Sequence, residues 1–588
     1  MRTVLQTPIE DRERGIAMIM VIGVGAVLAG LVVAAISYSL GGLRKARSDQ
    51  DWNAAIAAAY AGVEEYQSRL ANDTGYFLSG NPSSTFSNPT AATPAPVKLP
   101  TGAATNSAFG VGATGTWAEV PGSSGAAQYR YEIDNSRFNI DGTLRLRSTG
   151  RSGDETRTIV ADLKQQGFID FLYFTDYEVM DPTALNPTST ANCAIRYPGS
   201  RPGCSTIYFG GADVIKGPLH TNDTIQTNGA AKFQGKTTTG WQNPSGGANY
   251  LKSGTTPTFS VPGDPSVMPI IGMPPTNSQI KKETRTDLAD VPNPGCLYTG
   301  PTSITFTSDG KMQVISPWTK ATRIGNAADS TGTSPAACGT PGSAGLAKTT
   351  VTGGSTKYVG QEVTVFPNMV IYVQNVPNAS GNVNGTPSSD TPPFSSTVKC
   401  ESNGNSLGYP VSKEDLPFTN AYGCKNGDAF VEGTVKGNVT VAAENYIYVT
   451  DDLEYEDDTE DMLGLIGNNA VWVWNPMDGN KPLNGSKNRK IDAAILSVAH
   501  TFMVQNYNKG NDDRGTLSVY GAIAQKFRGP VGTGSGASMS TGYGKDYVYD
   551  ERFRYTAPPK FLSPVTTTYG VNVWVEVSPV MNPDGSYR

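Results

Sequence analysis

The densest group of side chains that could do chemistry is an acidic run from Asp451 to Asp461. Eight of its eleven residues are carboxylates. Paired carboxylates hydrolyse glycosidic bonds, and carboxylate oxygens are ligands that Ca²⁺ prefers. A plain solvated loop, in which like charges repel each other, is the third interpretation. The spacing lacks the D-x-[DN]-x-[DN]-G order of an EF-hand. A calcium site here would use Asp451, Asp452, Glu454, Asp457 and Asp458.

Other catalytic chemistry finds little support. The chain has two histidines, His220 and His500, far apart in strand-and-turn patterns, so we expect structural roles for both. No HExxH or P-loop motif occurs, and Ser497 has no visible base beside it. We therefore predict no catalytic residue and no cofactor other than calcium. A polysaccharide-active enzyme is the least favoured hypothesis.

A cluster of basic residues between positions 214 and 286 suggests a nucleic-acid contact. It is interleaved with Trp241, Tyr250 and Phe259, which could stack on bases. The whole chain carries a formal charge of −6, so no long-range attraction to phosphate is built in. A mixed loop surface is the alternative. The predicted DNA-contacting residues are Lys216, Lys232, Lys236, Lys252, Lys281, Lys282 and Arg285.

Six cysteines form an even set without a CxxC pair, which argues against zinc or thioredoxin-like chemistry. In an oxidising compartment three disulfides are expected, and sequential pairing is the simplest of the 15 connectivities. Buried free thiols are the alternative. The cysteines are Cys193, Cys204, Cys296, Cys338, Cys400 and Cys424.

The first element that could position these groups is a long helix. Residues Ile16 to Leu40 form an uncharged run long enough to cross a bilayer of ~30 Å. Apolar residues then continue at three- and four-residue spacing as far as Leu70, on one helix face. The sequence Asn72-Asp73-Thr74-Gly75 supplies a stop. We predict one helix over 16–71, half in lipid or a filament core and half on a globular domain.

This amino-terminal segment resembles the class III signal peptides of type IV pilins and pseudopilins. Gly15 matches the last leader residue and Ile16 the methylated first mature residue. Met20 replaces the usual glutamate, as in PilX-type minor pilins and tip pseudopilins. The resemblance implies a leader over 1–15, cleavage by a prepilin peptidase, and other pilins as partners. An ordinary single-pass anchor is the alternative.

The fold class that the sequence predicts is mainly β. After a loop-rich insert, residues 129–165 alternate apolar and polar residues, with turns at Asp141-Gly142 and Gly153-Asp154. This predicts a three-stranded meander and a small pilin-like β domain over 72–166. From 167 to 588 short strands recur with Gly and Asn corners, typical of a β-solenoid, with a β-sandwich as the alternative.

The region 168–565 also resembles an uncharacterised bacterial envelope family, and large competence-type minor pilins that display a β-solenoid head. The matching segments include Gly217–Gly229, Met462–Pro476 and Thr541–Phe561. The resemblance implies architecture, because the family has no established catalytic residues.

Together these features predict a non-enzymatic minor pilin or pseudopilin, placed in the cytoplasmic membrane before assembly and in a surface filament afterwards. Low charge and 66 glycines fit an exported protein. Assembly priming, adhesion to a surface ligand and DNA uptake are the expected roles. A membrane-anchored envelope adhesin that never enters a filament is the alternative.

Overall fold

The computed structural model describes residues 12–87, 97–111, 116–138, 143–165, 167–186, 188–197, 201–387, 389–394, 398–400, 404–535, 538–564 and 569–588. The chain divides into two compact units. The smaller unit contains the chain up to Gln165 together with Tyr569–Arg588, and the larger unit spans 166–568. Residues 1–11 of the predicted leader lie outside the described residues.

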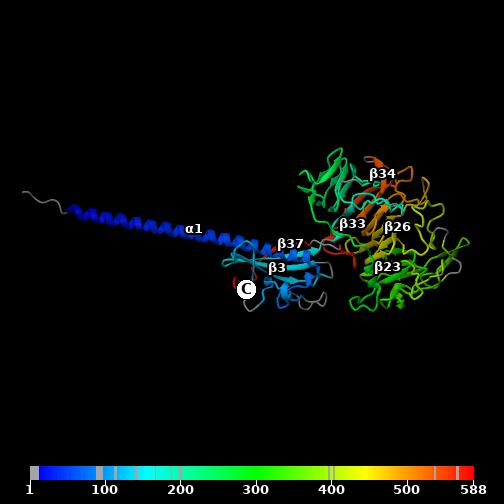
Figure 1. Cartoon of the computed structure of the whole chain (residues 1–588), viewed down its shortest axis with the longest axis horizontal. Helices are drawn as coiled ribbons and strands as arrows, with labels where there is room; N and C mark the ends of the chain where they lie inside the picture. The colour runs from blue at the N-terminus through cyan, green and yellow to red at the C-terminus, as the bar shows by residue number, and fades with distance from the viewer. Residues whose placement is uncertain are drawn as a thin grey trace, which may run out of the picture. The chain divides into compact units, whose positions relative to one another are not determined.

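One long helix, α1, dominates the smaller unit (Figure 1). It runs over Arg12–Asn72 and so matches the helix predicted for 16–71. Its carboxyl-terminal half packs on a sheet through a stripe of fully buried residues that includes Ala59, Val63 and Tyr66. Gly150 allows this close approach, because a Cβ there would lie 2.1 Å from the carbonyl oxygen of Ala55.

The sheet of the smaller unit is antiparallel, with the order β1-β2-β3-β4-β37. Its three inner strands are the predicted meander. The register joins β2 to β3 and β3 to β4 in consecutive hairpins, which the alternating pattern anticipates. The strands are β1 (Ala118–Glu119), β2 (Ala127–Asp134), β3 (Thr143–Ser152), β4 (Glu155–Gln165) and β37 (Tyr569–Val577).

The carboxyl-terminal boundary of the predicted head domain is wrong, because β37 returns to the smaller unit. Tyr569 pairs with Gln165, and the two strands run antiparallel from there. The tail beyond β37 is also fixed there: the Arg130 guanidinium donates to the Gly585 carbonyl at 2.7 Å, and the Thr156 hydroxyl to the Met581 carbonyl at 2.8 Å. The larger unit is therefore an insertion between two adjacent strands.

The larger unit is built on a ladder of ten parallel strands. Both faces of this ladder are buried, as is usual for parallel sheets. In spatial order the strands are β14 (Ser266–Val267), β11 (Thr237–Thr239), β8 (Leu219–Thr221), β5 (Tyr173–Tyr177), β33 (Thr516–Phe527), β31 (Arg489–Ser497), β27 (Met462–Gly467), β25 (Asn438–Ala443), β23 (Met369–Gln374) and β15 (Cys296–Thr299).

The chain enters this ladder in its middle. It builds β5, β8, β11 and β14 towards one end, restarts at β15 at the other end, and returns until β33 closes on β5. The connection between β14 and β15 covers the outer face, with Ile271 and Ile280 in its core. Within it, the Asn277 amide donates to the carbonyls of Ala443 and Ile466 on two neighbouring strands.

A second set of strands runs beside the first, and several strands belong to both. It contains β16 (Thr302–Thr307), β24 (Ala429–Val435), β26 (Tyr446–Tyr455), β36 (Gly544–Tyr549), β7 (Val214–Lys216), β10 (Lys232–Phe233) and β13 (Thr258–Phe259), with β31 and β33 between β26 and β36. Strands β28 (Ala470–Val473) and β32 (Met503–Val504) extend the first half of β26, and β6 (Phe209–Gly210), β9 (Ile225–Asn228) and β12 (Tyr250–Ser253) form a separate parallel sheet.

The chain also contains short antiparallel strands and 3₁₀ turns. The strands are β17 (Lys311–Ile315), β22 (Gln361–Thr364), β18 (Arg323–Ile324), β19 (Gly332–Thr333), β20 (Thr349–Thr352), β21 (Ser355–Tyr358), β29 (Met477–Asp478), β30 (Lys481–Pro482), β34 (Gly532–Ser535) and β35 (Ser538–Gly542). The 3₁₀ turns are η1 (Thr74–Leu78), η2 (Gly102–Ala104), η3 (Ser107–Phe109), η4 (Phe168–Asp170), η5 (Ser278–Thr284), η6 (Ala336–Cys338) and η7 (Glu551–Arg554).

Asparagines stack at one corner of the strand ladders. The backbone N–H of Asn469 donates to the Asn445 carbonyl at 2.9 Å, and that of His500 to the Asn469 carbonyl at 2.9 Å. The Asn445 amide also donates to a carboxylate oxygen of Asp428. Burial raises the pKa of Asp428 to about 7, although hydrogen bonds from Tyr446 and Asn445 oppose this rise.

We expect the smaller unit to fold without the larger one. Gln165 and Tyr569 already face each other in the sheet. The variant that tests this replaces residues 166–568 with a two-residue Asn-Gly turn, which links these two residues as a hairpin. It should unfold cooperatively by circular dichroism in nonionic detergent. A chain that stops at Gln165 is the control and should melt at a lower temperature, because it lacks β37 and the tail contacts. Equal melting temperatures would contradict this arrangement.

Asp428 should make the stability of the larger unit fall as pH rises from 4 to 7. The folded chain binds this proton more tightly than the unfolded chain, so the stabilisation is complete below the ordinary pKa of 3.8 and is lost as pH rises through about 7. The change is on the order of 1 kcal/mol per pH unit. Urea unfolding of wild type and Asp428→Asn at several pH values measures it. The variant should lack the fall in the free energy of unfolding that Asp428 causes between pH 4 and pH 7. An identical pH dependence in both proteins would refute this role of Asp428.

Candidate functional site

The amino-terminal half of α1 is an exposed apolar surface. Every large apolar side chain from Met18 to Leu43 is more than half exposed. The helix is long and apolar enough to cross a membrane by length and composition. Burying such a side chain is worth roughly 1.5–3 kcal/mol, so this surface strongly favours lipid or other apolar helices over water. Gly15 and Ile16, the predicted processing residues, lie in the first turns of this helix.

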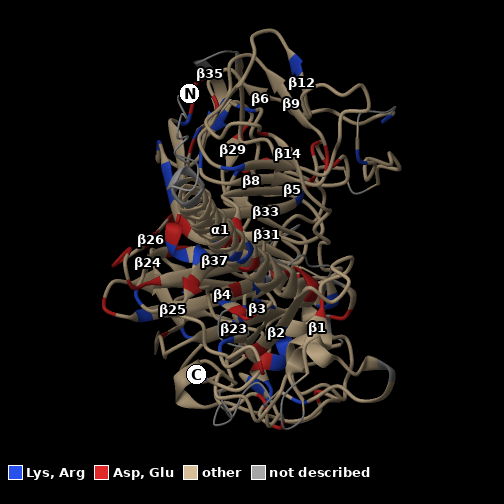
Figure 2. Ribbon diagram, turned by 90° about the vertical axis from the view of Figure 1, so that its left-hand side faces the viewer, with Lys and Arg blue, Asp and Glu red and all other residues tan. Residues whose placement is uncertain are grey.

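The acidic run forms the second half of β26 and the turn that follows it. Acidic segments gather beside β24 and β26 in Figure 2. The in-register neighbour on β31 supplies the opposite charge: Arg489 is 1 % exposed and pairs with both Asp451 and Asp452, at 3.0 Å from the latter. Lys490 pairs with Glu454 at 3.0 Å. Three of the five predicted calcium ligands are therefore held by cations of the protein itself.

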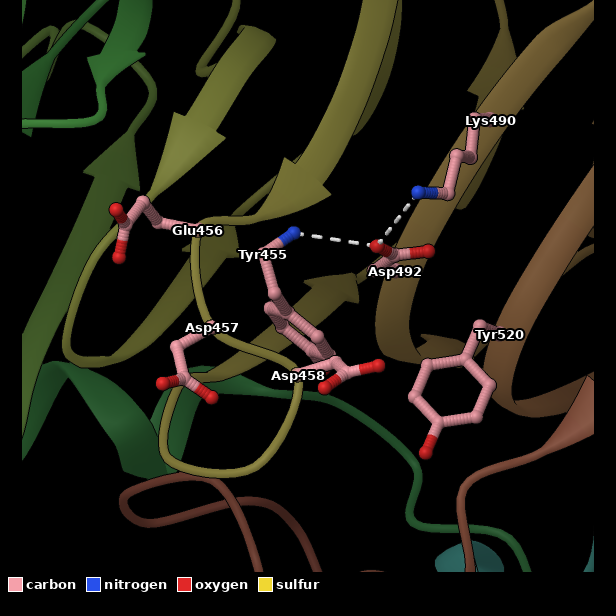
Figure 3. A pocket seen from close by; sticks show the side chains of 7 residues that line it. All are labelled: Tyr455, Glu456, Asp457, Asp458, Lys490, Asp492 and Tyr520. Atoms are coloured by element: carbon pink, nitrogen blue, oxygen red, sulfur yellow. Dashed lines mark hydrogen bonds and ion pairs between the residues drawn. The ribbon is translucent and has the colours of Figure 1, made fainter.

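Three further acidic residues of the run, Glu456, Asp457 and Asp458, line a pocket of about 600 Å³ (Figure 3). Its walls come from the end of β26 and the following turn, from β31 and from β33. The lining residues are Tyr455, Glu456, Asp457, Asp458, Lys490, Asp492 and Tyr520. A second pocket of about 320 Å³ lies along β16, β24 and β26 and is lined by Thr305, Glu432, Gly433, Thr434, Asp451, Asp452 and Glu454.

Asp492 is the buried carboxylate of the first pocket. Its Oδ2 accepts from the Tyr455 backbone N–H at 3.2 Å and lies 3.6 Å from Lys490 Nζ. Burial raises its pKa, and the Tyr455 hydrogen bond and the Lys490 charge oppose this rise. Burial also raises the pKa of Tyr520, and the nearby charge of Asp550 adds to that rise.

No group of three or more His, Cys, Asp or Glu side chains is placed to hold a metal ion within the described part of the chain. The calcium site predicted at Asp451, Asp452, Glu454, Asp457 and Asp458 therefore stays a prediction. Asp457 is occupied in part, since it accepts from the backbone and hydroxyl of Thr459.

The basic residues predicted to contact DNA do not form one cationic surface. Four of them are neutralised: Lys216 by Asp546, Lys236 by Asp264, Lys281 by Asp329 and Arg285 by Asp287, all at 2.6–2.7 Å. Lys252 donates to the Thr256 hydroxyl. Lys232 is on β10, whereas Lys282 is on η5, which packs against β15 and β23.

The interleaved aromatic residues are buried or pack, partly buried, against the core. Phe259 stacks on Phe233 with ring centroids 4.8 Å apart, and the Tyr250 ring packs against Phe259 with centroids 5.2 Å apart. Trp241 is 9 % exposed. Stacking on nucleic-acid bases needs an open ring face, which this packing restricts.

Both histidines are engaged by the protein. His220 is buried, with its ring nitrogens 2.8 Å from the Thr238 hydroxyl and 3.0 Å from the Asn222 amide oxygen. Burial lowers its pKa to about 4, so it is neutral at physiological pH. His500 Nδ1 lies 2.5 Å from Asp181. Burial raises the pKa of Asp181, but hydrogen bonds from His500 and Thr183 outweigh burial and lower it.

Three disulfides lie in the larger unit, and they are the sequential pairs. They join Cys193 to Cys204, Cys296 to Cys338 and Cys400 to Cys424, with Cα atoms 5.4–5.8 Å apart. Cys296 opens β15 and Cys338 closes η6, so the second bridge ties a long insertion to the terminal strand of the main ladder. Each disulfide restricts the unfolded chain by closing a loop.

Sequence reasoning missed the partners of the acidic run. Arg489, Lys490, Asp492 and Tyr520 lie 28 to 59 residues beyond the end of the run at Asp461. They meet it because β26, β31 and β33 pair in parallel, with Leu453 opposite Ile491 and Asp492 opposite Tyr520. The signal that could have found them is the strand register, which the sequence does not give when the loops between strands differ in length.

Comparisons with known proteins add little to this description. No protein-family profile matches the chain, and no curated protein matches it in sequence. Among solved structures, it is similar to the competence-associated pilin ComZ from Thermus thermophilus, with 12 % identity and a TM-score of 0.25, over 90 % of this chain and 97 % of that one. A likeness at this score supports no conclusion about function.

If Asp451 and Asp452 serve mainly to neutralise Arg489, then replacing both should destabilise the larger unit with or without calcium. Asp451→Asn/Asp452→Asn leaves a buried guanidinium uncompensated, at a cost of about 1–3 kcal/mol. Thermal unfolding in EDTA and in CaCl₂ measures it. Asp458→Asn, whose carboxylate makes no ion pair with the described residues, is the control and should change stability by less than about 0.5 kcal/mol. A loss seen only in calcium would instead support a calcium site.

Proposed function

We propose that this chain is a pilin-like subunit of a type IV pilus or a related filament. The observation that carries the proposal is the division of α1 into two halves with opposite environments. The first half exposes its apolar side chains, and the second half is buried on an antiparallel sheet. The second half of such a helix is held by its own domain, and its exposed apolar first half is more stable against another apolar surface than in water.

In this proposal a prepilin peptidase cleaves after Gly15 and Ile16 becomes methylated. The segment Ile16–Leu40 first anchors the chain in the cytoplasmic membrane, and then packs against the helices of other pilins in the filament. Residue 20 is Met, so it offers no carboxylate to the amino terminus of a neighbouring subunit. This fits a subunit at the tip, which has no neighbour above it.

The larger unit is, in this proposal, a β-solenoid head displayed by the filament. The ten-strand parallel ladder and the stacked asparagine corner support that architecture. Assembly priming and adhesion are the roles we favour, without catalysis. DNA uptake is less favoured because four of the seven basic residues are already paired with carboxylates.

A single-pass envelope adhesin is the second candidate function, since the same helix could remain in the membrane. It differs in two observable ways: its amino terminus would not be processed at Gly15, and it would be missing from filaments sheared from cells. The exposed helix surface is common to both functions and does not separate them.

The mature amino terminus should begin with N-methylated Ile16. Mass spectrometry of protein from its native host measures this, and Gly15→Ala should abolish cleavage because the peptidase site is altered. The control is Gly23→Ala, a glycine further along the same helix with nothing within 4 Å of its added methyl group, which should be processed normally. An intact Met1, or cleavage beyond Leu40, would overturn the pilin proposal.

A further inference from the structure

Two carboxylates of the pocket at the end of β26 have unused acceptor capacity. Asp492 is only 4 % exposed. One of its oxygens is satisfied by Tyr455 and Lys490, but Oδ1 is buried and makes no hydrogen bond within the described part of the chain. A buried acceptor without a partner is costly, so it needs an explanation. Its side chain lines the pocket and does not belong to the acidic run, since it comes from β31.

Asp458 supplies the second free acceptor, from the turn on the opposite side of the pocket. Its carboxylate forms no hydrogen bond or ion pair with the described residues, and it points across the pocket towards Tyr520 (Figure 3). The charge of Asp458 contributes to the raised pKa of Tyr520, as expected for neighbours. The two free acceptors therefore line one cavity from two different elements.

The charge of the pocket selects the sign of its ligand. Four carboxylates line it against the single ammonium of Lys490. Lys436 lies 3.4 Å from Glu456 and the Arg552 guanidinium lies over the Tyr455 ring, so part of the negative charge is balanced at the rim. No counter-charge is bonded to Asp458 within the described residues. The net negative charge of the lining residues therefore favours a cation as the ligand of this pocket.

The shape and lining of the pocket favour an organic cation over a metal ion. No three carboxylates of the described residues converge closely enough to coordinate a metal. The cavity of about 600 Å³ is far larger than one ion, and Tyr520 presents a ring beside the carboxylates. An ammonium or guanidinium group donates several hydrogen bonds at once and is attracted to an aromatic face.

We propose that this pocket binds a primary ammonium or guanidinium group, with Asp492 and Asp458 as its acceptors and the Tyr520 ring beside it. The group could belong to a free polyamine or to a lysine or arginine side chain of a protein. Both sources present the same chemistry to the pocket, and the experiment below separates them.

Isothermal titration calorimetry of the full chain in nonionic detergent tests the proposal. The probes are spermidine and the blocked peptide acetyl-Gly-Arg-Gly-amide, at constant ionic strength. We expect saturable binding of one molecule per chain for at least one probe. Tighter binding of spermidine identifies the free polyamine as the source, and tighter binding of the peptide identifies a protein side chain.

Asp492→Asn and Asp458→Asn should each weaken binding about tenfold or more, because each removes a charged acceptor. Asp512→Asn removes an exposed carboxylate that does not line this pocket, and should leave the affinity unchanged. The Asp458 variant keeps the test decisive if Asp492→Asn fails to fold, since Asp458 is exposed and its carboxylate makes no hydrogen bond or ion pair with the described residues.

Three results would overturn the proposal. The first is no saturable heat from either probe up to about 10 mM, a range that covers weak sites. The second is unchanged affinity in both Asp492→Asn and Asp458→Asn. The third is binding of CaCl₂, lost in these variants, while both amines stay silent, which would make this a metal site.

Discussion

Parallel pairing between strands that are far apart in the chain decides which residues meet in the larger unit. The decisive contact is β33 on β5, which joins the last part of the unit to its first strand. Without this pairing, the strands from β5 to β14 and the strands from β15 to β33 would form two separate stacks with exposed edges. Exposed edges of this kind invite aggregation, so the closure completes the unit and also protects it.

Buried charges lock the same junction. Arg528, just beyond β33, donates to Glu178, just beyond β5, at 2.9 Å, and both side chains are almost fully buried. Lys545 at β36 pairs with Asp213 before β7 at 3.2 Å. A buried pair of this kind contributes little net stability, yet losing one partner is expensive because the other charge stays buried. Such pairs therefore penalise any register other than the native one.

Local signals predicted the elements that depend on neighbouring residues. The three- to four-residue spacing up to Leu70 is a property of one helix, and the alternation over 129–165 belongs to adjacent hairpins, so both appear in the sequence. Each disulfide joins two cysteines that are consecutive in the sequence, which also makes the pairing accessible to sequence reasoning. In contrast, β37 looks like any edge strand, and nothing local shows that it pairs with β4.

The candidate pocket lies beyond sequence reasoning for the same reason. Its acidic turn was visible, but Asp492 and Tyr520 join it only through the register of three parallel strands separated by loops of unequal length. Asp451 and Asp458 look equivalent in the sequence. Only the structure separates them, since Arg489 neutralises the first and the described residues give the second no partner.

The insertion of the larger unit between β4 and β37 has a physical consequence for the smaller unit. Both ends of the insertion leave the sheet at one point, where Gln165 faces Tyr569. The sheet of the smaller unit is therefore continuous across the insertion point, and the strands β2, β3 and β4 on which α1 packs lie outside the insertion. The exposed apolar surface of α1 and the pocket at the end of β26 thus belong to different units of the chain.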